Sequence, residues 1–472
     1  MKFKIILYNI LFVLVTMCIY LAMYTKLNNI DFVLKAIGIL SLLLFVIIIF
    51  SWYQYTHSLL NLFMFFCLFL IIFNLGQFIV YFLNGGDFQI FAPYINSLTT
   101  FSDKIMYKAS IISYYSIICL HIGGLIAYNK NKIINKNVRY VNETYCKYIG
   151  YMLIIISLIP TFIYDYTYLM QGLSSGYKVS SLDINYGLFD DFARLFKVAL
   201  IFLMLGFRSN KKISKLFYIF FLFYSIFKIW ATGQRGYEFI FIIIITYLYY
   251  EYIANFNLKK VLMIFFITMI LFSLMNSVVY VRDTTNKVSF ERVINNIVSK
   301  NIITEVFAEF GSTFYTTELI VNEVPKTYDF SYGKEYLSSF LSILPNINGL
   351  NNYLININII HKLLRTSEIG LGGSFIGEAY YNFSIGIFLF MFLVGYYLYK
   401  MIGLRFDKNN SINLFKVGII LAFYQNAIWL CRDSIMSLPR KCLIEIGLPI
   451  LLYNFIKYLS KNKIIFKYKE HI

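Results

Sequence analysis

The stretch that decides the fold runs from residue 216 to residue 255 and reads LFYIFFLFYSIFKIWATGQRGYEFIFIIIITYLYYEYIAN. Two apolar runs, at 216–231 and 237–255, flank a short polar break. A helix rises about 1.5 Å per residue, so each run approaches the length that crosses the ~30 Å hydrocarbon core of a bilayer. We therefore predict two transmembrane helices joined by a tight turn, in which Arg235 lies between Gly233 and Gly236.

The composition of the whole chain agrees with this interpretation. Of its 472 residues, 59% are hydrophobic and 14% are charged, whereas soluble domains carry about 25% charged residues. The sequence predicts an all-α, polytopic membrane helix bundle of about 12 transmembrane helices, with the first run retained rather than cleaved as a signal peptide. The expected spans lie near 5–24, 32–53, 58–83, 108–128, 147–168, 192–207, 216–231, 237–255, 261–281, 379–401, 413–431 and 442–458.

Basic residues follow the even-numbered spans from the fourth onward, and this pattern predicts the orientation. The clusters lie within 130–139, 208–215, 259–260, 405–408 and 461–469. Because Lys and Arg concentrate in cytoplasmic loops, both termini are expected in the cytoplasm. The net charge of +18 then reflects membrane topology, and we expect no nucleic-acid partner.

One outward-facing connection is much longer than the others. We treat residues 1–472 as a single polytopic domain into which a large external loop, residues 282–378, is inserted between spans nine and ten. A loop of this length has its own organisation. Its first part, 289–320, has helical periodicity, whereas LPNINGLNNYLININII, 344–360, is expected to be irregular and polar.

Arginines precede the spans that begin at the outer face. They lie in the break at 232–236, in RTSEIGLGGSFIGEAYYNF (365–383) and in CRDSIMSLPRK (431–441). Guanidinium groups bind phosphate through paired hydrogen bonds, and helix N-termini favour anions. Convergence on an outer-leaflet anion is one interpretation. The alternative is that Arg235 extends to the interface while the glycines only form a turn.

A reaction at this face would also need a proton acceptor. Glu378 is the preferred carboxylate, and His361 is the only histidine on the predicted outer side. Glu378 pairing with an arginine and a merely solvated His361 are the structural alternatives. Further candidates are Glu309, Glu368 and Asp433, and the intramembrane ionisable residues are Lys197, Lys228, Glu238 and Glu445, of which Lys228 and Glu238 form a possible pair.

The remaining motif search predicts neither a metal nor a cofactor. The six cysteines are scattered without metal-ligand or disulfide spacing. No phosphate-binding loop, dinucleotide fingerprint or Asp-x-Asp pair is present in the sequence.

Two segments carry a family resemblance. TGQRGYEF (232–239) and GGSFIGEAYYNFSIGIFLFMFLVGYYLY (372–399), together with the span count and the long late loop, resemble the Wzy-type O-antigen and capsular polysaccharide repeat-unit polymerases. The family usually has glycine after its Asn-Phe pair, where this chain has Ser384.

The resemblance implies a multi-pass glycosyltransferase of the bacterial cytoplasmic (inner) membrane. Its substrates would be oligosaccharide repeat units linked to undecaprenyl diphosphate, which is the leaving group, and its possible partners a chain-length regulator and a flippase. With this chemistry, Glu378 is the expected base, with His361 as substitute. The expected diphosphate ligands are Arg235, Arg282, Arg432 and Arg440.

Three alternatives stay open at this level. An O-antigen ligase would share the span count, the loop and the arginines. A transporter or flippase of lipid-linked sugars would line a cavity at mid-membrane with its charges. A scaffold within an export complex would need none of these residues for chemistry.

Overall fold

The computed structural model forms two compact units, which we describe separately. Unit 1 comprises residues 1–131, 294–402 and 427–439, and unit 2 comprises 132–293, 403–426 and 440–472. The described residues are 2–86, 101–128, 139–175, 188–232, 235–254, 302–345, 349–364, 372–407 and 411–461.

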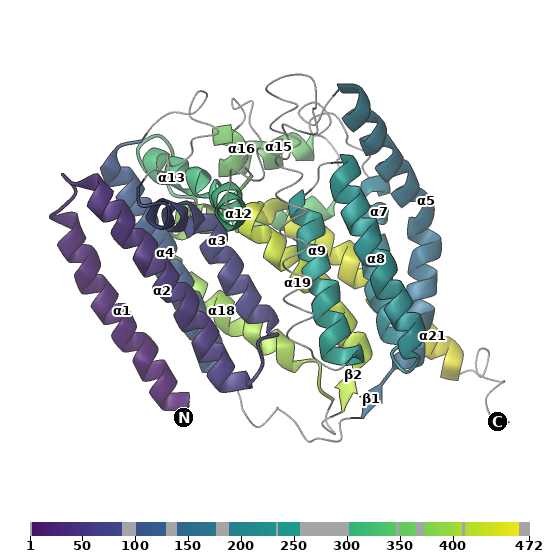
Figure 1. The fold of residues 1–472 in the computed structure, drawn as a ribbon. Helices are drawn as coiled ribbons and strands as arrows, with labels where there is room; N and C mark the ends of the chain where they lie inside the picture. Colours follow the sequence, from purple (N-terminus) through teal and green to yellow (C-terminus); the bar gives the residue numbers. More distant parts are fainter. Residues whose placement is uncertain are drawn as a thin grey trace, which may run out of the picture. The chain divides into compact units, whose positions relative to one another are not determined.

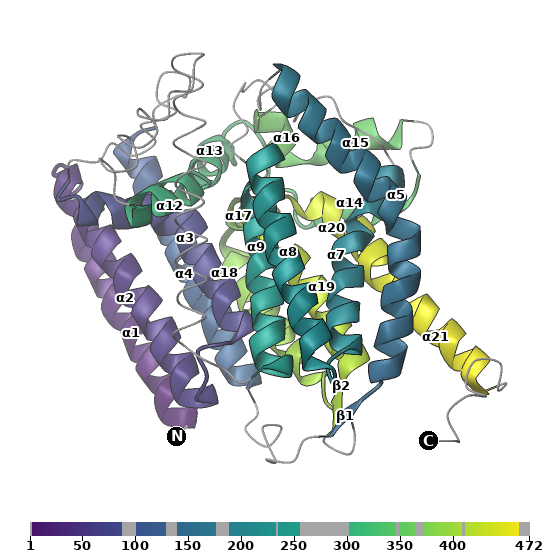
Figure 2. The ribbon, with the colours of Figure 1, turned by 45° about the vertical axis from the view of Figure 1, so that its right-hand side comes forward.

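Unit 1 is built on long apolar helices that lie side by side in Figures 1 and 2. They are α1 (Lys2–Tyr24), α2 (Ile30–Thr56), α3 (Leu62–Leu83), α4 (Asp103–Ala127) and α18 (Ile387–Gly403). Asparagines fix two helix starts: Asn29 Oδ1 accepts the N–H of Phe32, and Asn61 Oδ1 accepts the N–H groups of Phe63 and Met64. Such caps satisfy donors that the first turn leaves free.

Close packing between α4 and α18 depends on two small residues. A Cβ on Gly123 would lie 2.1 Å from the carbonyl oxygen of Phe392, and a Cβ on Gly395 would lie 2.0 Å from that of Leu120. Both positions therefore require glycine, as expected where transmembrane backbones approach closely.

The described part of the long loop is helical and belongs to unit 1. Helix α12 packs along α3, where the Phe73 and Phe310 rings are 5.1 Å apart and Gln77 Nε2 donates to the carbonyl of Ala308. The helices of this part are α12 (Ile302–Gly311), α13 (Phe314–Glu323), α14 (Lys334–Ser339), the 3₁₀ helix η4 (Phe340–Ile343), α15 (Leu350–Ile357) and α16 (Ile359–Leu364). The helical periodicity predicted for 289–320 is confirmed within 302–320, and 289–301 lies outside the described residues.

The prediction of irregular structure over 344–360 was wrong from residue 350 onward. Helices α15 and α16 occupy most of it. Asparagine has low helix propensity, which hid these helices in the sequence. Burial of Leu354, Ile359 and Ile360 supplies the tertiary packing that stabilises short helices.

Unit 1 also contains the short helical segments that precede α18 and those that follow α19 (Leu414–Trp429). They are α17 (Phe375–Phe383), the 3₁₀ turns η5 (Ser384–Gly386), η6 (Leu430–Arg432) and η7 (Ile435–Ser437). Helix α17 continues through η5 into α18, and the turn contains Ser384 with a φ of 50°.

Unit 2 is a second helical bundle, visible in Figure 2. Helix α5 packs along α7, and α8 packs along α9. Two short strands pair in parallel, with Tyr140 opposite Ile412. The elements are β1 (Tyr140–Val141), α5 (Glu143–Ser175), α7 (Leu188–Gly206), α8 (Lys211–Thr232), α9 (Arg235–Leu248), the π-helix η3 (Tyr249–Ile253), β2 (Ile412–Asn413), α19 (Leu414–Trp429, whose last residues belong to unit 1), α20 (Leu438–Cys442, whose first two residues belong to unit 1), the π-helix η8 (Leu443–Gly447) and α21 (Leu448–Lys461).

In the part of the chain that the structure describes, helices occupy eleven of the twelve spans predicted from hydropathy. Within the described residues, nine helical segments are long and apolar enough to cross a membrane. They coincide with nine predicted spans and are 3–24, 30–56, 62–83, 103–127, 143–170, 236–253, 375–403, 414–432 and 435–461. The predicted spans at 192–207 and 216–231 form helices α7 and α8, and the one at 261–281 lies outside the described residues. The all-α, multi-pass class is confirmed, whereas the cytoplasmic placement of both termini stays a prediction.

Candidate functional site

The polar residues of the GGSFIGEAYYNF motif lie on one face of α17. Ser374, Glu378 and Asn382 are spaced four residues apart, which places them above one another on a helix, and all three are fully buried. Ser374 begins the helix, since its Oγ accepts the N–H of Gly377 at 3.1 Å. Each of the three binds a different distant segment.

Ser374 links α17 to α13 and α3. Its Oγ lies 2.6 Å from Thr317 Oγ1, so one hydroxyl donates to the other, and the remaining hydroxyl donates to Asn74 Oδ1, which lies 3.3 Å from Ser374 and 3.2 Å from Thr317. A buried polar group needs such partners because an unsatisfied one costs about 1–3 kcal/mol. The loop helix α13 is therefore fixed to two apolar helices by hydroxyl and amide groups.

Glu378 holds the segment that follows α19. Its Oε1 accepts Ser434 Oγ–H at 2.6 Å, and its Oε2 accepts the backbone N–H of Ile435 at 2.9 Å. Ser434 in turn accepts hydrogen bonds from Asn358 Nδ2 and from the N–H of Met436. Both carboxylate oxygens are thus occupied by donors from within unit 1.

Asn382 brings in an acid that the sequence analysis did not select. Its Nδ2 donates to Glu335 Oε2 at 2.7 Å, and the N–H of Ile359 donates to Glu335 Oε1 at 3.1 Å. Burial raises the pKa of Glu335, and these two hydrogen bonds, with the nearby Glu378 carboxyl, oppose that rise. No local motif marks Glu335, so only the tertiary structure identifies it.

A third buried acid lies on α13. Glu318 is 1% exposed, and neither of its carboxyl oxygens has a hydrogen-bond partner among the described residues. Burial raises the pKa of Glu318 to about 8. Glu318, Glu335 and Glu378 form no ion pair with any described residue, and we call these three residues the three buried acids of unit 1.

Arg432 lies beside the start of α17. The N–H of Gly373 donates to the carbonyl of Arg432 at 2.9 Å. Gly372 has a φ of +78°, and a Cβ there would lie 2.7 Å from Arg432 Cγ. The side chain is partly exposed, and within the described part of the chain its guanidinium has no hydrogen bond or ion pair. It is therefore available to an anion.

His361 is close to the same segment. It is exposed on α16, and the neighbouring Ile360 lies against Gly373 and Asp433. Partial loss of solvent around the ring lowers the pKa of His361, and the negative charge of Asp433 opposes that shift. A neutral imidazole near pH 7 is able to accept a proton. Unit 1 therefore brings together two predicted site residues, Arg432 and His361, beside the segment that Glu378 holds.

Arg440 belongs to unit 2 and already has a partner. Its Nε and Nη2 lie 2.8 Å and 2.6 Å from Asp191 Oδ2. This ion pair joins α20 to α7. A diphosphate would have to compete with Asp191 for that guanidinium.

Of the remaining predicted site residues, two lie at the start of α9 and two lie outside the described residues. Arg235 is the first residue of α9, and Gly236 follows it in that helix. Gly233 and Arg282 lie outside the described residues. Convergence of the four arginines on one anion stays a prediction.

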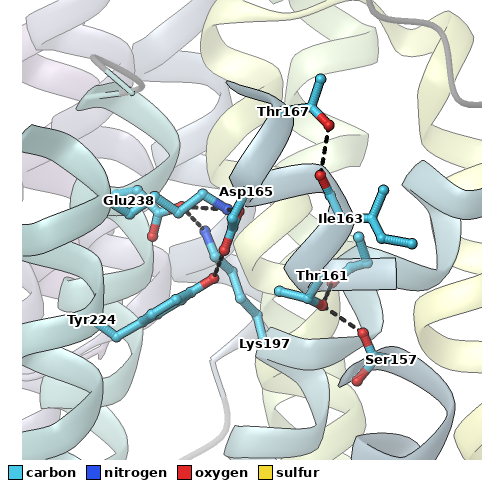
Figure 3. A network of polar contacts seen from close by, with 10 residues as sticks. Ser157, Thr161, Ile163, Asp165, Thr167, Lys197, Tyr224 and Glu238 are labelled. Carbon is cyan, nitrogen blue, oxygen red and sulfur yellow. Dashed lines mark hydrogen bonds and ion pairs between the residues drawn. The ribbon is translucent and has the colours of Figure 1, made fainter. Parts of the chain in front are cut away.

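Unit 2 contains a network of opposite charges, drawn in Figure 3. Lys197 Nζ of α7 lies 2.6 Å from Glu238 Oε1 of α9, and Lys228 Nζ of α8 lies 2.6 Å from Asp165 Oδ1 of α5. Lys228 also approaches Glu238 at 3.7 Å, and Tyr224 donates its hydroxyl to Asp165. The network thus joins four helices. The possible pair between Glu238 and Lys228 is present, but Lys197 is the closer partner.

Within the described residues, no three His, Cys, Asp or Glu side chains gather to hold a metal ion. The nine apolar helical segments of the described residues place the chain in the class of multi-pass α-helical membrane proteins.

The comparison with protein families specifies the class further. The family model for the O-antigen polysaccharide polymerase Wzy matches residues 5–463, so the chain belongs to this family. Comparisons with curated proteins and with solved structures gave no match. The family assigns the chain an O-antigen polymerase role as a membrane glycosyltransferase-type polymerase acting on lipid-linked oligosaccharide. The family resemblance of the sequence is confirmed.

Proposed function

We propose that the chain joins repeat units carried on undecaprenyl diphosphate, at the outer face of the bacterial inner membrane. The non-reducing-end hydroxyl of one unit forms a bond to the anomeric carbon of the growing chain. The bond from that carbon to the diphosphate oxygen breaks, and undecaprenyl diphosphate leaves with the electron pair. The hydroxyl proton passes to a protein base, and no metal takes part. A flippase would deliver the units, and a chain-length regulator would act on the product.

The guanidinium of Arg432, which has no ion pair with any described residue, carries this proposal. Guanidinium binds phosphate oxygens through two parallel hydrogen bonds and stays charged at every physiological pH. Negative charge develops on the diphosphate as it leaves, so a cation fixed beside it lowers the barrier. Gly372 and Gly373 hold the Arg432 backbone, which favours such a fixed position.

His361 fits the role of the base better than Glu378 does. A base must come within about 2.6–3.2 Å of the acceptor hydroxyl. Glu378 is fully buried, with Ser434 and Ile435 donating to its two oxygens, whereas His361 is exposed. This geometry supports Glu378 as a positioning residue, which anchors the segment that follows Arg432. The sequence had favoured the reverse order.

The test compares four variants in a host that lacks its own polymerase, and in liposomes with lipid-linked repeat units. Arg432→Ala is expected to lower kcat about 10²–10³-fold, and His361→Ala about 10²–10⁴-fold. Glu378→Gln keeps a hydrogen-bond acceptor, so kcat is expected to stay within a few-fold. Glu378→Ala releases the 434–436 segment, so KM is expected to rise more than kcat falls.

The outcomes separate the assignments. Cells with Arg432→Ala should accumulate single repeat units, whereas full-length but unattached chains would indicate a ligase. Units trapped on the cytoplasmic side would indicate a flippase. If Glu378→Gln were inactive and His361→Ala active, the base would be Glu378. Normal chain length in Arg432→Ala would remove Arg432 from the site.

A further inference from the structure

In the segment from Tyr332 to Leu344 of the long loop, polar side chains are buried and apolar side chains are exposed. In α14, Glu335 is fully buried, and Ser338 and Ser339 are buried beside it. The apolar side chains point outward: Leu337 is 73% exposed and Phe340 is 62% exposed. A helix on an aqueous surface shows the opposite pattern, with apolar residues toward the core.

The outward apolar side chains form a patch in unit 1. We call it the loop patch, and its members are Tyr332, Leu337, Phe340, Leu341, Ile343 and Leu344. From residue 336 to residue 345 the sequence YLSSFLSILP contains no charged residue. Large exposed apolar patches on soluble surfaces are uncommon and mark contacts with a partner or a membrane.

The loop patch adjoins a helix face that lipid must cover. The Tyr336 ring of α14 lies 5.4 Å from the Phe383 ring and 5.3 Å from the Phe390 ring. Both phenylalanines belong to the candidate span 375–403. The same span exposes Ile385 at 81%, with Leu389, Leu393 and Tyr397 following at four-residue spacing, as expected for a stripe that faces hydrocarbon.

The contact lies at the turn in the middle of this candidate span. Phe383 is the last residue of α17, and Phe390 lies in the first turn of α18, after the 3₁₀ turn η5. Backbone bonds hold α14 there, because the N–H groups of Ser331 and Gly333 donate to the carbonyls of Tyr381 and Asn382. Helix α14 thus packs against the middle of the candidate span, next to the exposed Ile385 and Leu389.

We propose that the loop patch is inserted into the hydrocarbon of the bilayer, as a short re-entrant segment within what the sequence treats as an external loop. Tyr332 and Lys334 stand at the start of α14, where Tyr and Lys are typical of the membrane interface. The carboxyl of Glu335 points inward and accepts from Asn382 and Ile359, so this ionisable group is not directed toward lipid. The occupant of the loop patch is therefore lipid acyl chain.

The experiment places nitroxide labels on the full chain in phosphatidylethanolamine–phosphatidylglycerol liposomes. The labels are attached through an unnatural amino acid, so the native cysteines stay in place. The test positions are Leu337 and Phe340. Leu389 is the hydrocarbon reference, and the exposed Lys326 of the same loop is the aqueous reference. Collision rates with oxygen and with a water-soluble nickel chelate are measured at each.

We expect Leu337 and Phe340 to match Leu389, with high oxygen and low nickel collision rates. Nickel rates equal to those at Lys326 would overturn the proposal and leave the loop patch to a protein partner in water. Low rates for both reagents would indicate a second copy of the chain. Insertion only after polyprenyl phosphate is added would identify the carrier lipid, rather than the bilayer, as the occupant.

A second measurement needs no substitution. Hydroxyl-radical footprinting of the unlabelled chain in the same liposomes should leave Leu337 and Phe340 unoxidised, while Pro325 and Lys326 are oxidised. Oxidation of Leu337 and Phe340 at the rate their exposure allows would contradict insertion, even if a labelled variant failed to fold.

Discussion

The charged network of unit 2 and the three buried acids of unit 1 hold their ionisable groups in opposite ways. In the network, Lys197 lies beside Glu238 (Figure 3) and Lys228 lies beside Asp165, so each charge is opposed by another. In unit 1, the three buried acids have no ion-pair partner among the described residues. Two of them, Glu335 and Glu378, are held by amide, hydroxyl and backbone N–H donors instead.

The two ways of holding a buried charge predict different responses to substitution and to pH. A buried ion pair depends on both partners, because a single charge left in a medium of low dielectric constant is strongly destabilising. A carboxyl group held by neutral donors can lose its charge, by protonation or by amide substitution, and still accept most of its hydrogen bonds. Unit 2 should therefore be sensitive to single substitutions, and unit 1 to pH.

The largest effect is expected from Glu238→Gln in unit 2. It leaves Lys197 buried without its close partner, which should lower the free energy of unfolding by about 3–5 kcal/mol. Thermal unfolding in detergent measures the loss. The double variant Lys197→Met/Glu238→Gln keeps the Lys228–Asp165 pair and should lose less than the sum of the single variants. Strict additivity would show that the two residues are not coupled.

An intermediate effect is expected from pH in unit 1. The pKa of Glu318 rises from about 4.5 to about 8 on folding, so its contribution to stability is complete below pH 4.5 and is lost as pH rises through 8. Each pKa unit is worth ~1.4 kcal/mol. Unfolding curves from pH 5 to pH 9 should therefore be flatter for Glu318→Gln than for the unsubstituted chain.

The control for this pH effect lies on the same helix. Glu323 is only half-buried at the end of α13, so Glu323→Gln should leave the slope between pH 5 and pH 9 unchanged. Equal slopes for Glu318→Gln and the unsubstituted chain would mean that Glu318 does not titrate in this window.

The smallest effect is expected from an ion pair at the surface of unit 2. Lys416 Nζ lies 2.9 Å from Asp407 Oδ1, and both side chains are partly exposed. Asp407→Asn should change the free energy of unfolding by less than ~1 kcal/mol, since exposed pairs contribute little. A loss as large as that of Glu238→Gln would show that pairing, rather than burial, sets the sensitivity of unit 2.

Sequence patterns predicted the membrane helices well because their signal is local. A run such as 62–83 is continuous and apolar, and a capping asparagine at residue 61 marks its start. The helices α15 and α16 were missed because asparagines obscure their apolar positions. The polarity inversion of α14 is likewise invisible in the sequence, where Leu337 and Glu335 only suggest a mixed surface loop.

The candidate site divides in the same way. Arg432 and His361 were selected as residue types suited to phosphate and to proton transfer, and both lie beside the segment held by Glu378. The burial of Glu378, the pairing of Arg440 with Asp191, and the acids Glu318 and Glu335 depend on contacts across more than forty positions of sequence or on burial. No local pattern records them.

The sequence by itself determined the class of the protein, the positions of most of its membrane helices and the family to which it belongs. Hydropathy and short motifs act over one helix, and these properties need nothing more. The tertiary structure alone decided which acids are buried, that Arg440 is already paired with Asp191, and which loop segment turns its apolar side outward. Burial and hydrogen bonding depend on segments that meet only when the chain is folded, so they follow from packing rather than from the order of residues.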